Sequence, residues 1–139
     1  MTMEKIFLIV KEESMKKIEI IEAQIESDAL FLMPKEWYKE YETPVAGGQM
    51  LVDSDREAFI YLLEQGEEYV YVHIPASIWP KLERANQERV QVKLCLTEEV
   101  QLILTNFQEE LQYLVGNIKG NGNYGTKLPE LIEELFPTF

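Results

Sequence analysis

The sequence predicts an α+β fold: an antiparallel sheet, or a small open barrel, of about six to eight strands with helices packed on it. Three observations support this prediction. Residues 47–75 form three extended runs joined by two turns. A helical pattern follows at residues 77–86. After another strand pair, two helical patterns end the chain. One helix is thus inserted between hairpins, and two C-terminal helices cover the sheet.

The composition fits a single acidic domain spanning residues 1–139. Hydrophobic residues make up 46% of the 139 residues, which is enough for a core and argues against disorder. The formal net charge is −12, from 13 basic and 25 acidic residues. That balance argues against a nucleic-acid surface and against an anionic membrane, and it favours either solubility alone or a basic protein partner.

The scarcity of metal-ligating residues limits the possible chemistry. Cys95 is the single cysteine and His73 the single histidine, so multi-cysteine and paired-histidine zinc motifs are excluded. No metal or cofactor is predicted. No apolar run has transmembrane length, and residues 6–10 form a poor secretory signal. A cytoplasmic location is expected.

The central hairpin, residues 58–63 and 69–74, sets the predicted face pattern. Strand side chains alternate between faces, so loop length decides which residues lie together. A loop of odd length pairs Ile60 with Val72 and Leu62 with Val70. It gathers the aromatic side chains on the opposite face, namely Phe59, Tyr61, Tyr71 and His73. We predict the odd loop because it separates aliphatic from aromatic residues.

The predicted aromatic face has two interpretations. It is either a second packed face or a binding surface of rings with polar tips. The second interpretation makes Tyr61, Tyr71 and His73 candidate binding residues. Asp53 and Asp55, on the preceding turn, join them as carboxylates that suit a divalent cation. The alternative for Asp53 and Asp55 is local turn hydrogen bonding.

Two further strand pairs complete the predicted sheet. Residues 16–25 and 29–33 flank a turn at residues 26–28. Residues 90–96 and 100–105 flank a three-residue loop, which places Leu94 and Leu102 on one apolar face and Cys95 on a polar face. A reactive thiolate needs a positive neighbour, and Lys93 is the nearest in sequence; the alternative for Cys95 is a structural thiol.

Capping residues and apolar stripes locate the helices. Ser77 is the predicted N-cap of the inserted helix, and Asn106 with Glu109 resembles a capping box. The stripe that follows Asn106 has a period near 3.6 residues. It comprises Phe107, Leu111, Leu114, Val115 and Ile118. The last helix begins near Pro129.

Four segments carry a family resemblance: GGQMLVDSD, AFIYLLE, WPKL and NIKGNGNYG. From about residue 16 to the C-terminus the chain resembles an uncharacterised protein family of Bacillus-type Firmicutes. That family has no assigned activity, so the resemblance implies a bacterial cytoplasmic protein and supplies no catalytic residues. Its members begin near Met15.

The sequence favours a small, acidic, non-enzymatic binding or regulatory protein, and no catalytic residues are assigned. The alternative is a small-molecule-binding or hydrolytic enzyme that uses the His73 face with Asp53 and Asp55. A hydrolytic triad requires a placed nucleophile, and the chain has no G-x-S-x-G motif.

Residues 1–14 also have two interpretations. The codons for Lys11, Glu12 and Glu13 can contain a purine-rich ribosome-binding sequence. The Ser14 codon then forms the spacer, and the Met15 codon is the start codon. We therefore expect translation to begin at Met15. The competing interpretation is that the apolar residues 6–10 are a genuine strand, paired in the sheet and buried.

Overall fold

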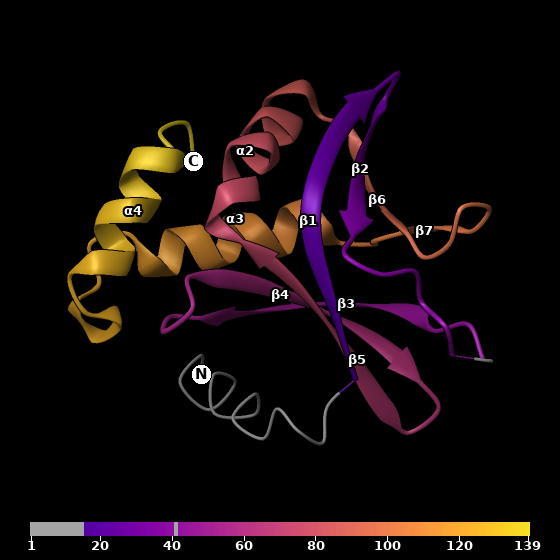
Figure 1. Ribbon diagram of the computed structural model, residues 1–139. Coiled ribbons are helices and arrows are strands. Elements are labelled where there is room, and N and C mark those ends of the chain that lie inside the picture. Colours follow the sequence, from indigo (N-terminus) through magenta and orange to yellow (C-terminus); the bar gives the residue numbers. More distant parts are fainter. Residues whose placement is uncertain (1–15, 41) are drawn as a thin grey trace.

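Three runs of adjacent strands, β1–β2, β3–β4–β5 and β6–β7, build the sheet (Figure 1). The computed structural model describes residues 16–40 and 42–139, so the predictions for residues 1–14 lie outside the described chain. Seven strands lie in the described part: β1 Lys16–Glu26, β2 Ala29–Pro34, β3 Val45–Asp53, β4 Ala58–Gln65, β5 Glu68–Pro75, β6 Gln91–Cys95 and β7 Gln101–Ile103.

The strands form one curled, mixed sheet in the order β3-β4-β5-β1-β2-β6-β7. The predicted α+β class, strand number and helix order are confirmed. The pairing is mixed because β1 runs parallel to β5 and β2 runs parallel to β6, while the other neighbours are antiparallel. The first hairpin therefore occupies the centre of the sheet, and the later strands are added on both sides of it.

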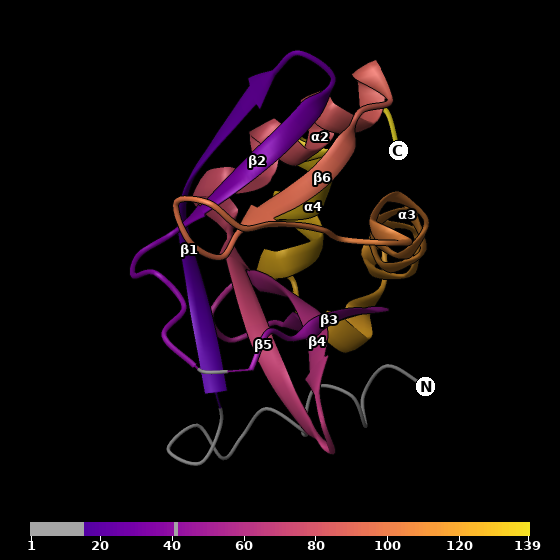
Figure 2. The same ribbon diagram turned by 90° about the vertical axis from the view of Figure 1, so that its right-hand side faces the viewer.

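The helices of the described residues lie on one side of the sheet (Figures 1 and 2). The α-helices are α2 Trp79–Glu88, α3 Phe107–Ile118 and α4 Lys127–Leu135, and two short 3-10 turns are η2 Ala76–Ile78 and η3 Gly122–Tyr124. None of the helices in the described ranges has the length and apolarity needed to cross a membrane.

The main core fills the space between the sheet and these helices. Phe59 on β4 stacks on Trp79 of α2, with ring centroids 4.4 Å apart, and both side chains are fully buried. Phe136, just after α4, packs against both rings. The predicted stripe of α3 is buried against the same cluster, at Phe107, Leu111, Leu114, Val115 and Ile118.

The predicted register of the central hairpin is wrong. Leu62 pairs with Tyr71 and Gln65 pairs with Glu68, so the loop has two residues, an even number. Gly66 begins that loop with φ +63°, a conformation that glycine adopts freely. Phe59 and Tyr61 therefore lie in the main core, whereas Tyr71 and His73 lie on the opposite face.

The predicted register of the β6–β7 hairpin is confirmed. Leu94 pairs with Leu102, and the Leu96 N–H donates to the Val100 carbonyl across a three-residue loop. The two hairpins differ in burial. Seven of the eight β4 residues are buried, so both faces are apolar and no polar face fixes the register.

Of the two predicted helix caps, Ser77 is wrong, and Asn106 is right in position but makes no capping hydrogen bond. Ser77 lies in η2, and the N-cap of α2 is Ile78, without a side-chain hydrogen bond. Asn106 does occupy the N-cap of α3, but in the left-handed conformation with φ 60°. Its side-chain amide donates instead to the Gly48 carbonyl at 3.2 Å, so it ties α3 to β3 rather than capping α3.

Candidate functional site

The structure separates the five residues that the sequence predicted as a site. His73 lies opposite Ile60, which lies opposite Leu51, and this face also holds Tyr71 and Asp53. The Tyr61 side chain lies on the helix-covered face, stacked on Phe107 at 5.8 Å between ring centroids. A site that uses Tyr61 together with His73 would therefore have to span the sheet.

The Asp53 carboxylate organises the turn between β3 and β4. Its Oδ1 accepts hydrogen bonds from the backbone N–H groups of Asp55 (3.1 Å) and Arg56 (3.2 Å). Its Oδ2 lies 3.7 Å from the Arg56 guanidinium. The Asp55 side chain is exposed. Across residues 16–40 and 42–139, no group of three or more His, Cys, Asp or Glu residues could hold a metal ion.

His73 is a buried, neutral imidazole at pH 7. The residue is 5% exposed, and its Nε2 atom has no hydrogen-bond partner within residues 16–40 and 42–139. Burial, together with the smaller effects of the positive charges of Lys17 and Arg56, lowers the pKa of His73 to about 4. A general base works best with a pKa near the working pH, so this environment does not favour His73 in that role.

The Tyr61 hydroxyl closes the gap between the two ends of the curled sheet. It accepts from the Gly48 N–H at 3.0 Å and donates to the Thr105 carbonyl at 2.7 Å. Burial raises the pKa of Tyr61 above its ordinary value. The hydroxyl therefore has a structural task between β3 and the end of β7.

A groove of about 790 Å³ lies where α2, α3 and the β6–β7 hairpin meet. That volume is within the range of small-ligand sites. Amide side chains predominate along its walls, and Ile103 and Val92 supply apolar contact. The amides are Asn86, Gln87, Gln91, Asn106, Gln108 and Gln112.

One amide in the groove has an unused acceptor. Gln108 Nε2 donates to the Val90 carbonyl at 3.3 Å, and Gln108 Oε1 is buried without a partner in the described part of the chain. Exchanging the two amide atoms would set an oxygen against that carbonyl, so the orphan atom is the oxygen. Buried acceptors are nearly always satisfied, so Oε1 is suited to a donor from a ligand or from water.

The open edge of β7 borders this groove. The Leu104 N–H donates to the Val92 carbonyl at 2.9 Å, and the Leu96 N–H donates to the Val100 carbonyl at 2.9 Å. Because antiparallel neighbours alternate, the backbone groups of Gln101 and Ile103 point away from β6. The Ile103 side chain is 45% exposed. Among the described strands, β7 therefore presents an unpaired edge.

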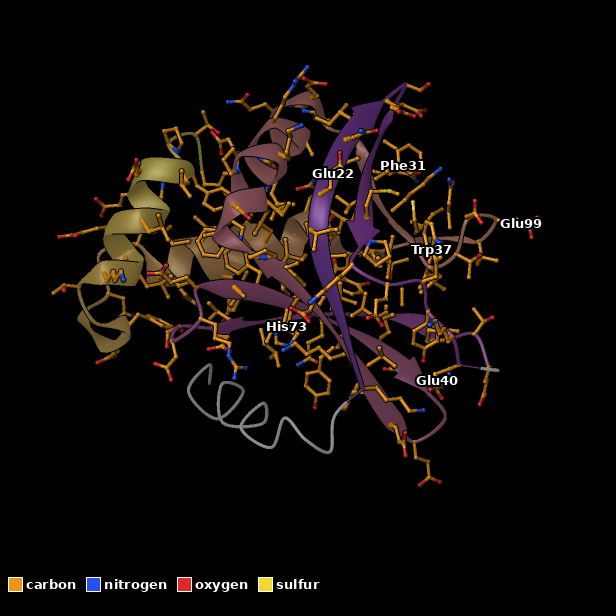
Figure 3. The ribbon with its side chains drawn as sticks, viewed as in Figure 1. Glu22, Phe31, Trp37, Glu40, His73 and Glu99 are labelled. Atoms are coloured by element: carbon orange, nitrogen blue, oxygen red, sulfur yellow. The ribbon has the colours of Figure 1, made fainter. Side chains whose placement is uncertain are left out.

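An acidic, aromatic hollow lies at the other end of the same hairpin. Trp37, 41% exposed, lines it together with Thr97, Glu98 and Glu99. Figure 3 shows Trp37 and Glu99 near the hairpin tip. An indole face beside carboxylates favours a cation.

Neither the groove nor the hollow was predicted from the sequence. Gln108 and Gln112 are spaced i, i+4 on α3, which is typical of a solvated polar helix face. Nothing in the sequence shows that this face meets Asn86, to which Gln112 Nε2 donates at 2.9 Å. The only usable signal was the unusual number of amides between residues 86 and 112.

Fold and site together define a small α+β domain with an open strand edge and an amide-lined groove. Comparison with protein families matches residues 18–136 to a family of unknown function, UPF0738. The chain belongs to this family, which confirms the expected membership in an uncharacterised Bacillus-type family.

Three curated relatives illustrate the similarity. The chain is 38% identical over 120 residues to the UPF0738 protein YjbL of Bacillus subtilis, covering 86% of this chain and 97% of YjbL. A UPF0738 protein of Bacillus velezensis is 41% identical over 121 residues, covering 87% and 98%. One from Geobacillus is 42% identical over 89 residues, covering 64% and 71%. No solved structure matches the chain.

Proposed function

We propose that this protein is a non-enzymatic binding protein that takes up an extended, basic segment of a partner protein along β7. The observation that carries the proposal is the open edge of β7, with the amide-lined groove at one end and the Trp37 hollow at the other. An added strand hydrogen-bonds to such an edge, and pockets beside it select side chains.

The chemistry of the two ends supports a polypeptide ligand. Asn and Gln side chains both donate and accept, as backbone amides do. Gln108 Oε1 offers an acceptor for one further N–H. Glu98 and Glu99 beside Trp37 attract a Lys or Arg side chain. The net charge of −12 steers a basic partner toward the protein.

The hydrolytic alternative has less support. Asp53 is engaged in its turn, Tyr61 lies across the sheet, and the imidazole of His73 is buried with a low pKa.

A displayed library of random peptides, selected on the full chain, tests the proposal. Enriched peptides should alternate apolar residues and contain Lys or Arg. Ile103→Pro removes an N–H that β6 does not use, and proline is tolerated on edge strands. It should weaken the selected peptides about tenfold or more, equivalent to roughly 1.4 kcal/mol.

Matched variants define the controls. Ile103→Thr keeps the N–H and the β-branched shape, so it should retain most of the affinity. Glu98→Gln with Glu99→Gln should reduce the affinity for basic peptides several-fold. Tyr113→Ser, at an exposed position of α3 outside the groove, should have no effect. Equal binding by the Pro and Thr variants would exclude strand addition at β7.

A further inference from the structure

Beyond Ile103, the edge of β7 is closed by a junction with β3. The Tyr61 hydroxyl donates to the Thr105 carbonyl at 2.7 Å and accepts from the Gly48 N–H at 3.0 Å. The Asn106 side chain donates to the Gly48 carbonyl at 3.2 Å. Thr105 is the next residue whose carbonyl points away from β6, and that carbonyl is already used. A segment added along β7 must therefore end, or leave the sheet, at this junction.

The amide-lined groove adjoins the junction. Ile103, Leu104 and Thr105 form part of its wall, together with the first residues of α3. β7 runs toward the groove, away from the hairpin tip at residues 97–99. A segment that pairs antiparallel with β7 runs the opposite way, so its N-terminal end lies at the groove. Antiparallel pairs are the more stable and the more frequent arrangement.

Two buried acceptors at the groove have no partner within residues 16–40 and 42–139. One is Gln108 Oε1, in the groove wall. The other is Oε1 of Glu83, a residue that is 8% exposed. Glu83 Oε2 accepts from Thr138 Oγ1 at 2.7 Å and from Gln87 Nε2 at 3.3 Å. Thr138 and Gln87 both line the groove, so the Glu83 carboxylate stands behind its wall.

The charges around the groove suit a cationic group. The charged residues of the wall are Arg89 and Glu109, and the Glu83 carboxylate behind the wall makes the local balance negative. The Arg89 residue is exposed, so water solvates its charge. Glu109 and Glu110 lie in the first turn of α3, where they offset the positive end of the helix dipole.

We propose that the segment bound along β7 is the free N-terminal end of the partner protein, with its α-ammonium group in the groove. This inference rests on the proposed function. An α-ammonium group carries a positive charge and several N–H donors, which match the unmet acceptors Gln108 Oε1 and Glu83 Oε1. A chain that begins in the groove also needs no path past the Tyr61 junction.

The register of the added strand places the basic side chain of the partner. Its first one or two residues lie in the groove, and the next one faces Ile103. Position 99 precedes position 103 by four residues, so the residue four further along the segment faces Glu99 and the Trp37 hollow. The Lys or Arg should therefore be at about position 6 or 7 of the partner chain.

Synthetic peptides with either a free or an acetylated N-terminus test the proposal. Their sequence is one enriched on the full chain from a library displayed with free N-termini. Acetylation removes the positive charge and changes little else, so it should weaken binding at pH 7 about tenfold or more. The dissociation constants are measured by isothermal titration calorimetry.

A variant of the groove shows where the ammonium group binds. In Gln108→Met, which removes the acceptor, the free and acetylated peptides should bind within about threefold of each other. A purely structural effect would weaken both peptides alike and leave their ratio unchanged. Gln24→Met, the same substitution at an exposed position of β1 outside the groove, should keep the full ratio. Far-UV circular dichroism verifies that both variants fold.

A nitroxide spin label at the C-terminal end of the free peptide reports its direction on the unaltered chain. The label should broaden the amide signals of Thr97 and Glu99 more than those of Leu104 and Thr105. The opposite pattern would mean parallel addition and would overturn the proposal.

Two further results would overturn it. One is equal binding of the free and acetylated peptides by the unaltered chain, and the other is a full acetylation effect in folded Gln108→Met. In both cases the proposed function stands if Ile103→Pro still weakens the peptides. Failure to find any peptide that depends on Ile103 would instead reject the proposed function itself, and this inference with it.

Discussion

At the scale of single residues, Tyr61 does more for the fold than its burial alone suggests. Its hydroxyl satisfies two backbone groups, the Gly48 N–H and the Thr105 carbonyl, at places where β3 and the end of β7 meet. Gly48 itself has φ +70°, a backbone conformation that glycine adopts more easily than other residues. One side chain thus links the two ends of a seven-stranded sheet.

Tyr61→Phe should therefore lower the free energy of unfolding by about 0.5–1.5 kcal/mol, because two hydrogen bonds to part-buried backbone groups are lost. Urea titration followed by circular dichroism measures the loss. Tyr113→Phe removes a hydroxyl from a side chain that is 61% exposed. It should change stability by less than about 0.5 kcal/mol. Equal effects of the two substitutions would argue against the bridging role.

The His73 imidazole should make stability depend on pH between about 4 and 6.5. Its pKa is about 4 in the folded chain and 6.5 ordinarily, so the unfolded chain binds more protons in that interval. Stability is then fully present above pH 6.5 and is lost as the pH falls toward 4. The expected loss by pH 5 is about 2 kcal/mol.

His73→Leu should remove that pH dependence. Urea titrations at pH 7 and pH 5, on both chains, give the difference between the two losses, in which the contributions of the carboxylates cancel. A loss of the same size in the Leu variant would mean that other groups cause it.

At the scale of elements, the helices and most strands could be predicted because each has a pattern of its own. The stripe of α3 from Phe107 to Ile118 is buried as predicted. The β6–β7 register followed from its one polar face. The β4–β5 register could not be predicted, because Phe59 and Ile60 are both fully buried, on opposite faces. The turn at Gly66 decides the register there.

Leu111→Ala should destabilise the chain by about 2–5 kcal/mol, because the side chain is fully buried between α3 and the sheet. Leu131→Ala on α4 should also destabilise it, but by less, since Leu131 is only partly buried against the core. Urea titration measures both values. Losses below about 0.5 kcal/mol, the usual effect of surface changes, would mean that these helices are not docked on the sheet.

At the scale of the whole molecule, the candidate site depends on contacts that no local pattern encodes. The groove joins residues of α2, β6, β7 and α3, and each of these segments alone has an ordinary solvated face. The Asp53 turn, in contrast, was predicted as one of two interpretations because its hydrogen bonds are local. Local chemistry is readable in a sequence, and the meeting of distant polar faces is not.

The excess of acidic residues should make the fold more stable in salt. The net charge is −12 on 139 residues, so the excess acidic side chains repel one another in the compact state. About 0.3 M NaCl screens that repulsion beyond the first few ångströms. The melting temperature should therefore rise between low salt and about 0.3 M NaCl. Glu133→Gln with Glu134→Gln on α4 should reduce the rise. A melting temperature that falls with salt would mean that attractive ion pairs dominate.

The central position of β1 and β2 has a consequence for synthesis on the ribosome. This hairpin is made before the other described strands, yet both of its edges pair only with strands made much later, β5 on one side and β6 on the other. The nascent chain must hold two bare strand edges until residues 68–95 have emerged. Parallel pairings between such distant segments slow folding. During that interval the charges of Glu19, Glu22 and Glu26 along β1 should disfavour aggregation of the unpaired strand.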